Sequence, residues 1–194
     1  MPINLSTAPL KIVSAYHGQA EYTRAARSKP PSDWGKLWLE YAVEPYWADW
    51  ALGQFNVART RQQLSQPILG LEGLAVEVEC LVNSGIETLV QKAYLRITHR
   101  LPSPSPGRAV SIYAADPGNQ WLRQQGVVGT GIGDNILLQI NPLAENWSEW
   151  VPYVMAHEVH HATWGDHYFS LDRSPAWLKG KRLCTILPVP LSRS

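Results

Sequence analysis

Three residues between positions 154 and 163 have the types and spacing of a metal-dependent hydrolase. His157, Glu158 and His161 form the motif H-E-x-x-H. On an α-helix, residues four apart lie on one face about one turn from each other, so the two imidazoles can hold one metal ion. The glutamate beside the first ligand can reach a water molecule on that ion and act as general base. The motif therefore predicts a zinc site with His157 and His161 as ligands and Glu158 as the catalytic base.

The residues around the motif predict the helix that this chemistry needs. Ser148 is a suitable N-cap, Pro152 falls near the start, where proline is tolerated, and Gly165 is suited to end the helix. His160 points about 100° away from His161 on such a helix, so we expect it outside the ligand pair. The alternative is a helix whose histidines make ordinary hydrogen bonds. Apolar residues recur at helical spacing before the motif, namely Trp150, Val151, Val154 and Met155.

The third zinc ligand is not part of this motif, and catalytic zinc sites usually take three protein ligands and a water molecule. His167 stands six residues after His161, the interval of the third ligand in metzincins. Trp164, however, occupies the position of the required glycine, and no methionine follows. Asp166 and Asp172 are carboxylate alternatives, and a site with no third protein ligand in this chain stays open. Imidazole and carboxylate ligands also suit divalent ions other than zinc.

The elements expected around this helix indicate an α+β fold with a helical N-terminal half. A break in the second helical region is expected near residues 83–85. The glycine-rich stretch 126–133 does not follow the G-x-G-x-x-G pattern of nucleotide-binding loops, and we interpret it as a turn that feeds a strand. The expected strands are at residues 10–15, 109–113 and 135–141, and the expected helices at 34–55, 66–99 and 148–164.

Length and composition limit the class of protein. A chain of 194 residues fits a single domain spanning residues 1–194. The net charge of +1 with 17% charged residues gives no indication of a nucleic-acid partner. No apolar run is long enough for a membrane span, and the N-terminus has no signal-peptide pattern. Two cysteines without a C-x-x-C motif suit a reducing compartment, so we expect a cytoplasmic protein. The sequence does not indicate an oligomeric state.

Two segments carry a likeness to a known family. Gly133-Asp-Asn-Ile-Leu-Leu-Gln-Ile-Asn-Pro142, followed by Val154-Met-Ala-His-Glu-Val-His-His161, resembles a bacterial family of predicted zinc-dependent proteases with gluzincin-like character. The likeness is strongest over about residues 108–164, and the doubled histidine matches the family signature. The resemblance implies a zincin-like domain with a peptide or protein substrate. It also implies that the strand containing Ile136, Leu138 and Ile140 is an edge strand beside the motif helix, where it binds substrate as an added strand.

The chain departs from this family after the motif helix. Family members carry a further helix with an E-G-x-A type segment, whose glutamate resembles the third ligand, whereas Glu158 is the last glutamate of this chain. Residues 171–194 contain three prolines and no such segment, which is the pattern of a truncated C-terminus. Two functions therefore stay open: a zinc-dependent peptide-bond hydrolase, and a catalytically inactive zincin-like binding module that lacks a third metal ligand.

Overall fold

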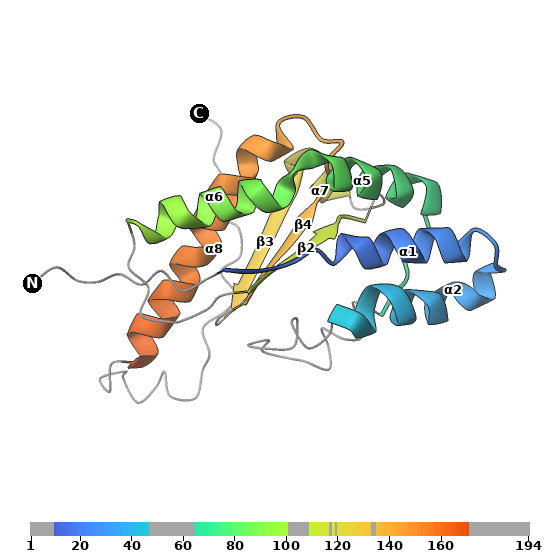
Figure 1. Cartoon of the computed structure of the whole chain (residues 1–194), viewed down its shortest axis with the longest axis horizontal. Coiled ribbons are helices and arrows are strands. Elements are labelled where there is room, and N and C mark those ends of the chain that lie inside the picture. The colour runs from blue at the N-terminus through green and yellow to red at the C-terminus, as the bar shows by residue number, and fades with distance from the viewer. Residues whose placement is uncertain are drawn as a thin grey trace, which may run out of the picture.

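The computed structural model describes residues 10–46, 65–100, 109–116, 118, 120–132 and 135–170 (Figure 1). The part of the expected helix 34–55 that follows Tyr46 lies outside these residues. Helices and a small sheet place the described part in the α+β class, as predicted. Its elements, in chain order, are β1 (Lys11–Val13), α1 (Tyr16–Ala26), α2 (Pro31–Trp38), the π-helical turn η1 (Leu39–Val43), the 3-10 turn η2 (Glu44–Tyr46), α5 (Leu71–Ser84), α6 (Ile86–Thr98), β2 (Ala109–Ala114), α7 (Gln120–Gln125), β3 (Val127–Ile132), β4 (Asn135–Ile140) and α8 (Trp147–Ser170).

The four strands form one mixed sheet in the order β1-β2-β4-β3. β1, β2 and β4 run parallel, and β3 runs antiparallel to β4. On β4, Leu138 pairs with Ile112 of β2 on one side and with Gly129 of β3 on the other. The expectation that β4 is an edge strand is therefore wrong, because the stretch interpreted as a glycine-rich turn is itself a strand that covers it. In the described sheet, the two edge strands are β1 and β3, and β3 is the one beside β4.

One face of the sheet carries the main hydrophobic core. The register places alternate residues of β2 and β4 on this face, where they are buried together with apolar residues of α1, α5, α6 and α8. Helix α8 lies along β3 and also packs against α6, which crosses it (Figure 1). The core residues of β2 and β4 on this face are Val110, Ile112, Ala114, Ile136, Leu138 and Ile140.

A pair of hydrogen bonds connects helix α1 to the sheet. The side-chain amide of Gln19 donates to the carbonyl of Ala114 at 3.1 Å, and its oxygen accepts from the N–H of Ala114 at 2.7 Å. This pair of bonds fixes α1 at the end of β2.

Gly85 adopts a left-handed conformation with φ of 67° between α5 and α6, where glycine avoids the strain of a side chain. The break predicted near residues 83–85 is thus confirmed.

A carboxyl group is buried on the core side of α5. Glu77 is 3% exposed, and within the described part of the chain its Oε2 has no hydrogen-bond partner. Burial, reinforced by the charge of Asp116 and opposed by Arg123, raises the pKa of Glu77 from 4.5 to about 7. Between pH 4.5 and about 7, the carboxyl of Glu77 therefore stays protonated in the folded chain, whereas it is ionised in the unfolded chain. The contribution of this group to stability is complete below pH 4.5 and is lost as the pH rises to about 7.

Glu77→Gln is expected to remove this decline, because glutamine stays neutral at every pH. The unfolding free energy of the variant minus that of the wild type should therefore increase by about 2–3 kcal/mol from pH 5 to pH 8. Urea unfolding at both pH values measures the difference. The exposed Glu79 of the same helix provides the control, and Glu79→Gln should follow the wild type. An unchanged pH dependence in Glu77→Gln would show that this carboxyl is already ionised in the folded chain.

Candidate metal and catalytic site

The motif lies in the middle of α8, which begins at Trp147 and continues to Ser170. The predicted end at Gly165 is wrong, since the helix passes through it. Val151, Met155 and Val159 are fully buried and hold the inner side of the helix against the core. The two motif histidines occupy the exposed side. Packing of the inner side thus fixes which way the histidines face.

His157 and His161 converge, as their spacing predicts. Their Nε2 atoms are 3.0 Å apart, within hydrogen-bonding distance of each other, with the rings edge to face at an interplanar angle of 82°. Two nitrogens on one tetrahedral zinc ion, at bond lengths of 2.0–2.1 Å, are separated by about 3.3 Å. The pair therefore fits a zinc ion after a movement of a few tenths of an ångström. Both side chains are exposed, so an ion can approach from solvent.

The surroundings of His161 favour its neutral imidazole, the form that binds a metal ion. Partial burial lowers the pKa of its imidazole, and the charges of His157 and His160 lower it further. A histidine ligand must be neutral to offer its lone pair to a metal, and a lowered pKa keeps His161 neutral at pH 7. The ring of His160 is centred 6.3 Å from that of His161, so it lies outside the converging pair.

The side chain of Glu158 extends from the motif helix α8 towards β3 and packs against it. Glu158 is only 7% exposed, and its side chain covers Gly129 of β3. A Cβ atom at position 129 would lie 2.5 Å from Cγ and 2.9 Å from Oε1 of Glu158, and 2.6 Å from Cγ1 of Val154. Only glycine therefore allows α8 to approach β3 this closely. The site thus includes Gly129, a residue that the motif does not indicate; a glycine inside a β pattern is the general signal of such an approach.

Gly129→Ala is expected to push α8 away from β3, because the new methyl group overlaps Glu158 and Val154. Overpacking of this kind costs about 1–3 kcal/mol, and it displaces the proposed base as well. Chemical denaturation measures the free energy of unfolding. Gly35→Ala in α2 is the matched control, since a Cβ there meets no atom within 4 Å. Equal stability of Gly129→Ala and wild type would contradict the packing of α8 on β3.

No third metal ligand lies beside the histidine pair among the described side chains. Among the residues that the structure describes, no three His, Cys, Asp or Glu side chains are grouped to hold a metal ion. Helix α8 continues to Ser170, which places the backbone of residue 167 about 15 Å from that of residue 157 along the helix axis. The side chain of His167 lies outside the described part of the structure, so its assignment as third ligand stays a prediction. Asp166 lies on the same last turns, and Asp172 lies outside the described residues.

The three residues predicted to bind substrate are core residues instead. Ile136, Leu138 and Ile140 are fully or almost fully buried beneath the helices, and both sides of their strand are paired. A peptide cannot add to a strand without a free edge. The strand next to α8 with a free edge in the described sheet is β3. Any strand addition near the motif therefore takes place on β3.

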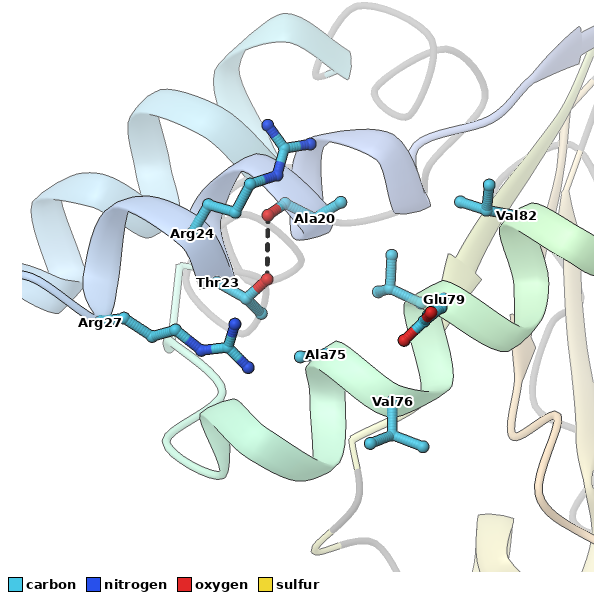
Figure 2. A pocket seen from close by; sticks show the side chains of 9 residues that line it. Ala20, Thr23, Arg24, Arg27, Ala75, Val76, Glu79 and Val82 are labelled. Atoms are coloured by element: carbon cyan, nitrogen blue, oxygen red, sulfur yellow. Dashed lines mark hydrogen bonds between the residues drawn. The ribbon is translucent and has the colours of Figure 1, made fainter.

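A surface hollow of about 280 Å³ lies on other elements, between α1 and α5 (Figure 2). Its walls are the aliphatic side chains of Val76 and Val82 and the stems of Arg24 and Arg27. The guanidinium of Arg27 donates to the carboxylate of Glu72 at 2.7 Å and 3.1 Å and ties α1 to α5. The hollow is a groove between two packed helices, and no motif residue reaches it.

The chain matches no protein-family model, no curated protein and no solved structure. The resemblance of the motif segments to zinc-dependent proteases therefore stays a prediction. None of the described helices is long and apolar enough to cross a membrane.

Proposed function

We propose that this chain is a zinc-dependent peptide-bond hydrolase. The observation that carries the proposal is the convergence of His157 and His161, with Nε2 atoms 3.0 Å apart, on the exposed side of a helix packed along an edge strand. Glu158 follows His157 in the sequence, and its side chain packs between α8 and β3. This arrangement supports the proposal, because two imidazoles, a carboxyl group and a strand edge of the described sheet lie on neighbouring elements.

In this mechanism, His157 and His161 would hold the ion from the exposed side of α8. A zinc ion held there would supply Lewis-acid chemistry, namely a water of lowered pKa and polarisation of the peptide carbonyl. The carboxylate of Glu158 would accept a proton from water and pass it to the leaving amine. The edge of β3 that is unpaired in the described sheet would offer backbone N–H and C=O groups to an extended peptide and align it with the motif. Burial of Glu158 against Gly129 holds the carboxylate in position between steps.

A second candidate function is a zincin-like binding module without catalysis. The observation that favours it is that the described residues supply two metal ligands and no third. The buried base argues for the hydrolase, because a module that only binds has no chemical need for Glu158.

The two functions are separated by assaying the full chain with and without zinc. Elemental analysis gives the zinc content, and mass spectrometry of a random-sequence peptide mixture gives newly formed amino termini. Zinc-dependent cleavage that a chelator stops supports the hydrolase. Bound zinc without cleavage supports the binding module and overturns the hydrolase. A chain that takes up no zinc overturns both.

A further inference from the structure

Two large aromatic side chains are exposed on the helix face that carries the motif. Trp150 is 45% and Tyr153 is 66% exposed, and their rings pack edge to face with centroids 5.7 Å apart. At 100° per residue, Trp150, Tyr153, His157 and His161 fall within an arc of about 80° around α8. The aromatic pair and the histidine pair therefore share one exposed surface. Each ring restricts the other, so the pair presents a partly ordered apolar platform.

The platform lies at a defined distance from the proposed zinc ligands. An ion held by His157 and His161 would lie level with the midpoint between them. With a rise of 1.5 Å per residue, Tyr153 is about 9 Å and Trp150 about 14 Å from that midpoint along the helix axis. An extended peptide advances about 3.3 Å per residue. The platform is therefore aligned with the third and fourth residues from the cleaved bond, on one side of it.

The direction of β3 decides whether the platform lies before or after the cleaved bond of the peptide. A Cβ atom at Gly126 would lie 3.1 Å from Cβ of Trp147, and one at Gly129 would lie against Val154 and Glu158. Both β3 and α8 thus advance in the same direction where they touch. A peptide added antiparallel to β3, the slightly more stable pairing, runs the opposite way, from His161 towards Trp147. Its residues after the cleaved bond then pass over Tyr153 and Trp150.

We propose that Trp150 and Tyr153 form a specificity subsite for large apolar or aromatic side chains at the third and fourth positions after the cleaved bond. This inference rests on the proposed hydrolase function. Contact between such side chains and the rings removes apolar surface from water and adds favourable aromatic geometry. Small or charged side chains at these positions gain neither contribution. The selected substrate is thus an extended peptide with an apolar segment after the cleavage point.

The test compares the zinc-loaded wild-type chain with Trp150→Ala, Tyr153→Ala and the double variant on a random-sequence peptide mixture. Wild type should prefer Phe, Trp or Leu over Ala at these two positions by about tenfold, the discrimination that a few methylene groups supply. The double variant should lose this preference and keep its zinc, and Tyr153→Phe should retain it. Leu69→Ala, which removes an exposed apolar side chain before α5, is the control and should cleave like wild type.

The outcomes distinguish this inference from the proposed function. Cleavage by the double variant with the wild-type preference overturns the subsite and leaves the hydrolase in place. If the double variant instead changes the side-chain preference at positions before the cleaved bond, the inferred direction of the peptide is wrong, and the subsite is overturned with it. If the double variant loses its zinc, the two single variants give the decision by the same criterion. No cleavage by the zinc-loaded wild type overturns both proposals.

Discussion

Replacing both His157 and His161 with alanine is expected to abolish zinc binding by this chain. Their Nε2 atoms form the converging pair on α8, and the described residues offer no group of three ligands elsewhere. Loss of an outer-shell partner alone costs about 10–100-fold in metal affinity, so loss of two direct ligands should leave no measurable site. Elemental analysis of the purified chains should find one zinc per wild-type chain and none in the variant.

Stability gives a second measurement of the same site. Zinc at about 100 times its Kd should stabilise the wild-type chain by about 2.7 kcal/mol, and it should not stabilise the double-alanine variant. His160→Ala is the matched control, because that exposed side chain lies on the same helix but outside the pair. It should retain both the zinc and the shift. Zinc retained by the double-alanine variant would place the site elsewhere in the chain and contradict the proposed function.

The sequence predicts the elements whose pattern is local. Alternating apolar residues indicate β2 and β4, and Gly85 marks the junction of α5 and α6. The four-residue spacing of His157 and His161 predicts their convergence, since helix geometry alone brings the rings together. These features depend on residues that are neighbours along the chain.

The features that sequence patterns do not indicate depend on residues that are distant along the chain. The apolar alternation of Ile136, Leu138 and Ile140 indicates which face of β4 is buried, but it carries no information on which edges of the strand are paired. The glycines of β3 weaken its strand pattern, yet Gly129 is needed there because Glu158 packs across it from α8. Burial of Glu158 could therefore be found only after α8 and β3 were placed side by side.

Glu158→Gln is expected to keep the zinc and lose peptide hydrolysis by about 10²–10⁴-fold, the usual contribution of a general acid–base group. Glutamine has almost the same size and can occupy the space beside Gly129 and Val154, so the packing of α8 on β3 is preserved. Its amide cannot take a proton from water at neutral pH. The measurements are kcat/KM on a cleaved peptide and the zinc content of the same sample.

The control for charge is Glu149→Gln, which removes an exposed carboxylate from the first turn of the same helix and should leave kcat/KM unchanged. Because zinc content and unfolding free energy are measured in parallel, a slow Glu158→Gln chain that is folded and zinc-loaded has lost only the base. Wild-type turnover in that chain would mean that another group moves the proton. Burial of Glu158 against β3 would then serve packing alone, and the mechanism with Glu158 as the general base would be overturned.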